Sequence, residues 1–241
     1  MRAFDTSGRP RGWVIDLGRR DYAPVWRWQK SLVPLRRRGI IRDTLIMVEH
    51  SPVYTLGRQT DPANVARLSP DTPRFEVERG GDVTYHGPGQ LVCYPIFDLQ
   101  RRGRDLHLFM RNLERGIINT LASYEVNARA EAGNTGVWVT TPAGGRKIAS
   151  IGVAAQKWVS YHGVAVNVNT DLEEFAQINP CGFDAAVMTS LAALTGRSVT
   201  LTEFRDRLIA AYGSVFEMDF DFVTTAVIAE DLKSEEAGGH V

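Results

Sequence analysis

Residues 137–169 read VWVTTPAGGRKIASIGVAAQKWVSYHGVAVNVN. Apolar runs rich in β-branched and small residues are interrupted by a turn containing proline and glycine at 142–145 and by a second break at 161–163. This alternation is typical of strands joined by turns. The stretch therefore predicts an antiparallel section of sheet made of three consecutive strands, at 137–139, 147–159 and 164–169.

Helical and extended patterns alternate upstream of these strands. Apolar residues recur at helical spacing in 21–38 and 105–124, and each segment begins with an aspartate that can cap the first turn. The arginine run at 36–38 precedes Gly39, and cations beside a left-handed glycine are typical of a helix C-terminus, so we assign this run no ligand. Two short strands are predicted at 44–50 and 53–56.

Two further helices are predicted downstream. One covers residues 185–194, and the other opens with a capping box formed by Thr200 and Glu203. We expect the second helix to run to Tyr212 and to stop at Gly213.

The interleaved order of these elements indicates the fold class. We expect one α+β domain over residues 1–225, with a mixed, largely antiparallel sheet packed by helices, and a disordered tail over 226–241. No glycine-rich phosphate-binding fingerprint follows a strand and opens a helix, which argues against dinucleotide-binding and P-loop folds.

Composition limits the classes of partner. The 241 residues carry 28 Lys and Arg against 28 Asp and Glu, so the overall charge gives no reason to expect a nucleic acid or a membrane as the main partner. The first residues lack the apolar core of a signal peptide, and we expect a cytoplasmic protein. The two cysteines, Cys93 and Cys181, show no metal-ligand spacing, and no metal is expected.

The segment RGGDVTYHGPGQ at residues 79–90 couples polar side chains to glycines. Glycine lets the backbone approach a ligand closely, although a Gly-Gly pair also serves in ordinary turns. In the alternation that follows, Thr84 and His86 would share one face of a short strand, and Val83 and Tyr85 the other. Such a segment could line a tunnel for an alkyl chain, although His86 taken by itself favours a structural role.

Lys147 and Cys181 are the candidate reactive residues. Small apolar residues follow Lys147 in its strand, so its ammonium can be partly desolvated; a solvated surface lysine is the alternative. Cys181 lies between Pro180 and Gly182 in a loop, whereas Cys93 lies in a buried strand pattern. A free thiol is only a few per cent thiolate at pH 7, and a nearby ammonium can supply the roughly 2 kcal/mol that raises this to about half.

Together these motifs resemble the signatures of the lipoyl(octanoyl) transferase family, which belongs with biotin and lipoate protein ligases to one catalytic-domain superfamily. The resemblance covers roughly residues 44–194 without a departure at the motifs. Its motifs, in chain order, are RGGDVTYH (79–86), GPGQL (87–91), RKIASIGV (146–153), HGVAVNV (162–168) and INPCGF (178–183).

The resemblance implies a catalytic domain like those of biotin and lipoate ligases, and roles for individual residues. Cys181 would form an acyl-thioester intermediate, and Lys147 would activate it. The implied substrate-binding residues are Arg79, Gly80, Gly81, Asp82, Val83, Thr84, Tyr85, His86, Ser150, Ile151, Gly152, Gly163, Val164 and Ala165.

The resemblance also implies the reaction and its partners. An octanoyl group would pass from octanoyl-acyl carrier protein to a lysine of lipoyl-domain proteins, which belong to 2-oxoacid dehydrogenase complexes and include the glycine cleavage H protein. No cofactor is needed, because a thioester is already activated, and two half-reactions through an acyl-enzyme predict ping-pong kinetics. A basic cluster at Arg101, Arg102 and Arg104 could dock an acidic carrier, or could be a solvated loop.

Two other readings remain open. An ATP-dependent ligase of the same superfamily would activate a free acid as an adenylate and would not need Cys181. A silent binding module for acyl chains or acylated carriers would need neither Cys181 nor Lys147.

Overall fold

Residues 44–50 form a strand whose side chains enter two different cores. The computed structural model describes residues 8–69, 71–142, 144–179 and 185–228, and among them strand β2 (Thr44–His50) lies inside an eight-stranded sheet. Leu45 and Met47 contribute to one core, and Ile46 and Val48 to the other. Both faces of the sheet are therefore covered, which explains the unbroken apolar run of this strand.

The large sheet has the order β11-β1-β2-β6-β10-β9-β8-β7. β1 pairs in parallel with β2 and β11, and the other neighbours pair antiparallel, so the predicted mixed, largely antiparallel sheet is confirmed. Its remaining strands are β1 (Arg11–Arg20), β6 (Gln90–Ile96), β7 (Ala128–Glu131), β8 (Asn134–Thr141), β9 (Gly144–Gln156), β10 (Val159–Asn167) and β11 (Asp219–Phe222).

A smaller sheet lies beside the large one. In the described ranges it has three strands in the order β4-β3-β5, with bounds Arg74–Glu76, Val53–Leu56 and Thr84–His86. It carries part of the glycine-containing segment found in the sequence. Its own core contains Tyr54, Tyr85 and Phe175.

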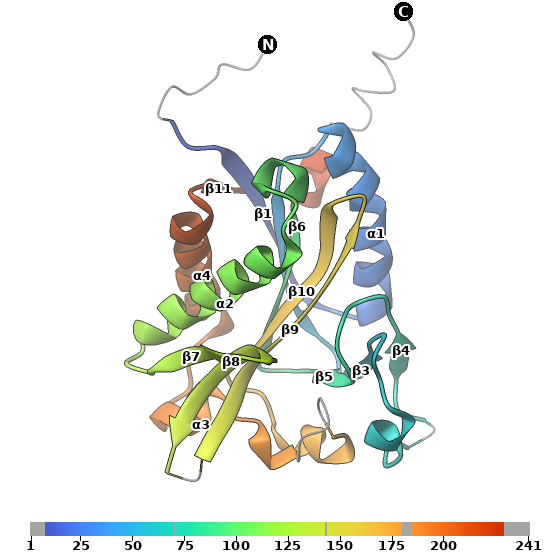
Figure 1. The fold of residues 1–241 in the computed structure, drawn as a ribbon, viewed down its shortest axis with the longest axis vertical. Helices are drawn as coiled ribbons and strands as arrows, with labels where there is room; N and C mark the ends of the chain where they lie inside the picture. Colours follow the sequence, from blue (N-terminus) through green and yellow to red (C-terminus); the bar gives the residue numbers. More distant parts are fainter. Residues whose placement is uncertain (1–7, 70, 143, 180–184, 229–241) are drawn as a thin grey trace, which may run out of the picture.

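Helices cover both faces of the large sheet (Figure 1). Helix α1 (Tyr22–Arg38) lies on one side, and α2 (Leu106–Ala122) and α4 (Leu201–Phe216) lie together on the other. A short helix, α3 (Leu191–Thr195), precedes α4. Single 3-10 turns occur at Pro62–Val65, Leu99–Arg102, Glu173–Gln177 and Ala185–Val187.

The first two predicted helices are confirmed. In α2 the predicted apolar stripe is buried except for its first residue, Leu106, which is half-buried, and the Asp105 carboxylate accepts a hydrogen bond from the Leu108 N–H at 2.8 Å. The helix ends at Ala122, two residues before the predicted end at 124.

Helix α1 ends at Gly39 in the left-handed conformation, directly after its arginine run. Its predicted cap is only half right, because Asp21 stands at the N-cap but its carboxylate accepts the Ser51 hydroxyl instead of a helix N–H.

The predicted strand break at 161–163 is wrong. Residues 159–167 form one strand, and the chain turns instead at Lys157 and Trp158, between the paired residues Gln156 and Val159. Both turn residues have positive φ, 50° and 68°, as a two-residue hairpin requires. Asparagine and glycine usually occupy such positions, so Lys-Trp gave no turn signal.

The predictions for the last two helices need correction. Residues 185–194 are not one helix, because Met188 pairs with Lys147 of β9 and the Ser190 side chain caps α3 separately. Helix α4 does not stop at Gly213. It continues to Phe216, whose side chain packs into the core, and the left-handed residue that ends it is Glu217.

The expected boundary at residue 225 is too early. Residues 225–228 form a helical turn, and the Ile228 side chain packs into the core beneath α1. The rest of the expected tail lies outside the described residues. Within the described part of the chain, no helix is both long and apolar enough to cross a membrane.

The contact between α2 and α4 depends on Gly116. A Cβ at this position would lie 2.3 Å from two ring carbons of Tyr212, which is fully buried. We therefore expect Gly116→Ala to lower the free energy of unfolding by about 1–3 kcal/mol in denaturant titrations. An isolated helix would show the opposite sign, because alanine is the better helix former by about 1 kcal/mol.

Gly145→Ala is the matched control. Nothing lies within 4 Å of a Cβ at Gly145, so this variant should stay within about 0.5 kcal/mol of wild type. A Gly116→Ala protein as stable as wild type would contradict the described packing of α2 on α4.

Candidate active site

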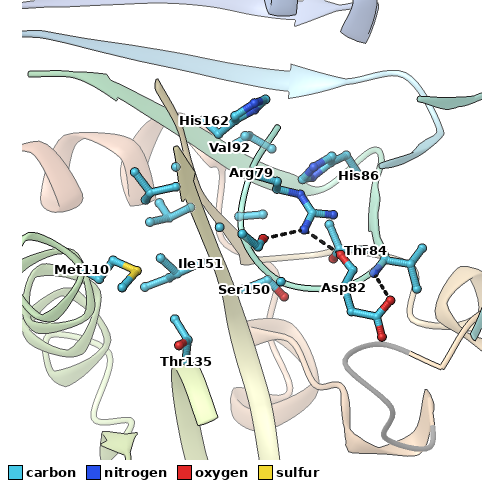
Figure 2. Close-up of a pocket in the computed structure, with 18 of the residues that line it drawn as sticks. Arg79, Asp82, Thr84, His86, Val92, Met110, Thr135, Ser150, Ile151 and His162 are labelled. Carbon is cyan, nitrogen blue, oxygen red and sulfur yellow. Dashed lines mark hydrogen bonds between the residues drawn. The ribbon is translucent and has the colours of Figure 1, made fainter. Parts of the chain in front are cut away.

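A cavity of about 540 Å³ lies between β9, β10 and the segment 79–86, which rests against these strands. Figure 2 shows Met110, Ile151 and Thr135 on one side of β9, and Arg79, Ser150 and Thr84 on the other. Lys147 and Val153 both line the cavity and are separated by about 20 Å along an extended strand. Aliphatic side chains such as Ile151, Val153 and Val164 line part of the wall among polar residues, so the cavity can bury an elongated apolar group.

The structure brings most of the predicted substrate-binding residues together. Every one except Tyr85 lines this cavity, and so does Lys147. The predicted alternation holds for Thr84 and His86, which face the cavity, while Tyr85 packs against Phe175 in the smaller core. Val83 belongs with Tyr85 to the smaller core, as predicted, and also reaches the cavity lining.

Arg79 holds the segment 79–82 in place. Its buried guanidinium donates to the carbonyl oxygens of Thr55 at 2.5 Å, Gly80 at 3.1 Å and Asp82 at 2.6 Å, and also to the Thr55 hydroxyl at 2.9 Å. Two of these bonds are drawn in Figure 2. Since the planar guanidinium presents its donors in a fixed geometry, the side chain sets the path of the loop that forms one cavity wall.

Gly152 lets this loop approach the sheet. A Cβ there would lie 2.8 Å from Arg79 Cδ and 3.1 Å from the Gly80 carbonyl oxygen. The Gly80 N–H also donates to the Val153 carbonyl at 3.2 Å. On the neighbouring strand, Gly163 pairs with Gly152. Glycines of three sequence motifs therefore meet in one place, where the backbone segments approach closely because no side chain lies between them.

Lys147 is buried, with 5% of its surface exposed. Its Nζ lies 5.3 Å from the centre of the Trp138 ring, a cation–π geometry. The Lys147 carbonyl accepts the Thr189 N–H at 3.0 Å, and Met188 pairs with the same residue. The alternative of a solvated surface lysine is therefore excluded.

The structure describes one of the two cysteines, Cys93, and Cys181 lies outside the described residues. Cys93 is fully buried in β6, as its sequence context predicted, and burial raises the pKa of its thiol. On the near side of the undescribed residues, the Asn179 N–H donates to the Asn64 carbonyl at 3.0 Å.

A buried amide network, which the sequence analysis missed, joins the cavity to the chain near Lys147. His86 Nδ1 is 2.8 Å from Gln90 Oε1, Gln90 Nε2 donates to Asn167 Oδ1 at 2.9 Å, and Asn167 Nδ2 donates to the Thr189 carbonyl at 3.1 Å. Polar residues inside the apolar strands β6 and β10 were the available signal. Because Gln90 Oε1 accepts, His86 carries its proton on Nδ1.

Buried histidines mark the other end of the cavity. Burial lowers the pKa of His86 to about 3, and that of His162 and His50 to about 4. Tyr22 of α1 stacks on His86 with ring centres 6.0 Å apart. His162, which the sequence had placed in a strand break, lines the cavity and lies 3.4 Å from Glu78. These histidines are therefore neutral at neutral pH, although the Arg79 cation lies in the same lining.

The basic cluster lies away from the cavity lining and is paired. Arg102 contacts Asp43 at 3.0 Å, Arg101 contacts Asp98 at 3.5 Å, and Arg104 donates to Gln100 at 3.2 Å. Arg102 thus has a structural role beside the 3-10 turn. A docking role for these arginines stays a prediction.

The sequence and the fold have counterparts in known proteins. An octanoyltransferase of Geobacter metallireducens is 44% identical over 213 residues, covering 88% of this chain and 97% of its own. An octanoyltransferase of Thermosynechococcus vestitus is 41% identical over 213 residues, covering 87% and 92%. A bipartite lipoate protein ligase of Thermoplasma acidophilum, solved with its E2 lipoyl domain, shares the fold with a TM-score of 0.67 at 18% identity, covering 94% and 92%.

Residues 21–213 match the lipoyl protein ligase A/B catalytic domain, and the chain belongs to that family. The matched range begins at the cap of α1 and ends within α4, so it contains every described residue of the cavity lining. Relatives that are 40–46% identical to this chain are octanoyltransferases.

The buried histidines predict a pH-dependent stability. Their pKa values are lowered from about 6.5 in the unfolded chain to about 3 or 4 in the fold, so unfolded chains bind more protons as the pH falls below 6.5. Stability is complete above that pH and is lost progressively toward pH 4. Each histidine contributes a loss of up to about 1.4 kcal/mol per pH unit.

Urea titrations between pH 7.5 and 5 measure this loss. His86→Gln should reduce the slope by about one proton, because this histidine no longer titrates in the unfolded chain. A free energy of unfolding that stays constant from pH 7 to 5 would be incompatible with neutral buried histidines.

Proposed function

We propose that this protein is the octanoyltransferase of protein lipoylation. It would transfer an octanoyl group from octanoyl-acyl carrier protein to the lysine of a lipoyl domain, through a thioester on Cys181. The observation that carries the proposal is the buried Lys147 in the lining of an elongated cavity whose walls include aliphatic side chains of β9 and β10. The names of relatives at 40–46% identity support the octanoyl group.

The first half-reaction acylates the enzyme. Lys147, as the neutral amine, takes the proton of the Cys181 thiol, and the resulting thiolate attacks the carbonyl carbon of the donor thioester. The new C–S bond forms as the bond to the carrier's thiol breaks, and the departing thiolate takes the proton back from the Lys147 ammonium. The octanoyl chain then lies along the cavity, where aliphatic groups from β9 and β10 surround it.

The second half-reaction forms the amide. The neutral amine of the acceptor lysine attacks the acyl-enzyme carbonyl, the bond to Cys181 breaks, and Lys147 takes the proton that the new amide nitrogen loses. This proton passes to the Cys181 thiolate, which restores the starting thiol and amine. A thioester carbonyl is already activated, so no ATP is consumed.

The partners follow from the two half-reactions. The donor is octanoyl-acyl carrier protein, and the acceptors are lipoyl domains of 2-oxoacid dehydrogenase complexes and the glycine cleavage H protein. These reactions belong to the cytoplasm. A lipoate protein ligase with the same fold was solved with its E2 lipoyl domain, which supports an acceptor of that class.

The acyl-enzyme can be weighed directly. After mixing with octanoyl-acyl carrier protein, wild type and Cys93→Ser should gain one octanoyl group that hydroxylamine removes, and Cys181→Ser should gain none. Intact-protein mass spectrometry is the measurement. ATP-dependent turnover of free octanoate without any adduct would replace this proposal with an ATP-dependent ligase. Octanoyl-carrier binding without an adduct or turnover would replace it with a binding module.

Lys147→Ala should lower the rate of enzyme acylation by a factor of about 10²–10⁴, because both half-reactions lose their proton acceptor. Lys157→Ala, at the exposed turn between β9 and β10, is the matched control and should keep full activity. Stopped-flow or quench-flow acylation compares the two. Near-normal turnover of Lys147→Ala would remove Lys147 from the mechanism.

A further inference from the structure

Glu114 is a carboxylate buried within the core on the side of α2 that faces the sheet. Only 1% of its surface is exposed, and its neighbours Leu113 and Ile117 belong to the main apolar core. Met110, one helical turn earlier, reaches the cavity in Figure 2 beside Thr135. Burying a carboxylate costs several kcal/mol unless hydrogen bonds compensate it, so its partners indicate what it is there to hold.

Both carboxylate oxygens of Glu114 are used. Oε2 accepts from Arg111 Nη1 at 2.5 Å, and Oε1 accepts the backbone N–H of Gly136 at 3.0 Å. Arg111 reaches in from the helix surface, where half of its side chain is exposed. The bond to Gly136 joins α2 to β8, and a charged acceptor makes it stronger than a neutral one would.

Gly136 in turn supports the Lys147 side chain. A Cβ on Gly136 would lie 2.7 Å from Lys147 Cε, 3.3 Å from Lys147 Nζ and 2.5 Å from the Ala149 carbonyl oxygen. Its φ of 126° is a conformation that residues with a side chain rarely adopt. Glycine is therefore required twice here, for the backbone angle and for the room that the lysine occupies.

Trp138 completes the support. Its ring centre is 5.3 Å from Lys147 Nζ, and the register between β8 and β9 shifts between Val137 and Trp138. The lysine thus lies between the backbone of Gly136 and the Trp138 ring. The position of β8 from Gly136 to Trp138, where its register against β9 shifts, decides where the Lys147 ammonium points. Glu114 is the residue of α2 that bonds to this part of β8, through the Gly136 N–H.

We propose that Glu114 is a positioning residue for Lys147. By holding the Gly136 N–H, it fixes the stretch of β8 against which the lysine side chain lies. This inference rests on the proposed function only in the role given to Lys147. The contacts themselves involve described residues alone.

The test compares three single variants at Glu114 and Gly136 and one double variant. Glu114→Leu removes both the charge and the acceptor, and should slow single-turnover acylation by octanoyl-acyl carrier protein on the order of 100-fold, the effect of a misplacement near 1 Å. The donor concentration at half-maximal rate should change less than about threefold, because the cavity is intact. Glu114→Gln keeps an acceptor for Gly136 and should recover most of the rate.

Gly136→Ala should slow acylation with Glu114 intact, since its Cβ displaces Lys147 Cε. The double variant Glu114→Leu/Gly136→Ala should lose little beyond the larger single loss, because both act on one lysine. Glu203→Gln, on the exposed side of α4, is the matched control and should behave as wild type.

A second readout does not require the transferase activity. The rate at which acetic anhydride labels Lys147, followed by peptide mass spectrometry across pH 6–9, should rise in Glu114→Leu and return toward wild type in Glu114→Gln. Unchanged labelling and acylation in folded Glu114→Leu would overturn the inference. If Glu114→Leu does not fold, equal rates in wild type and Gly136→Ala would overturn it. Wild type that forms no octanoyl adduct would instead count against the proposed function.

Discussion

The buried guanidinium of Arg79 is the interaction on which the cavity depends. It ties the segment 79–82 to Thr55 of the small sheet through backbone carbonyls, while its aliphatic part rests on Gly152 of the large sheet. A cation buried in this way must keep its acceptors, because an unsatisfied charge costs far more than a neutral group. The loop therefore has little freedom, and the wall it forms is set before any ligand binds.

The same cation shapes the electrostatics of the cavity. Burial is the main reason for the low pKa of His86 and His162, and the charge of Arg79 lowers both further. Tyr22 stays protonated, since burial outweighs the effect of Arg79 on its pKa. The histidines and the tyrosine at this end are therefore uncharged at neutral pH, while Arg79 supplies a buried positive charge beside them.

Much of the fold followed from local signals. The start of α2 and the end of α1 were predictable, because the Asp105 cap and the left-handed Gly39 each act within one turn of their helix. Prediction failed where the local residues were unusual for their task, as at the Lys157–Trp158 hairpin, or where packing overrode them, as at Gly213 in α4. The registers that place Gly152 opposite Gly163 were beyond any local pattern.

The sequence by itself determined the chemistry of the site: the glycine-containing segments, Lys147 and its apolar strand, and the family. Their signals lie within short stretches of chain. Only the tertiary structure decided which distant residues complete the cavity and support the lysine. Tyr22, Met110 and His162 reach the cavity from separate elements, and Glu114 meets Gly136 across the interface of helix and sheet. The physical reason is that such contacts depend on strand register and helix packing, which are properties of the whole core.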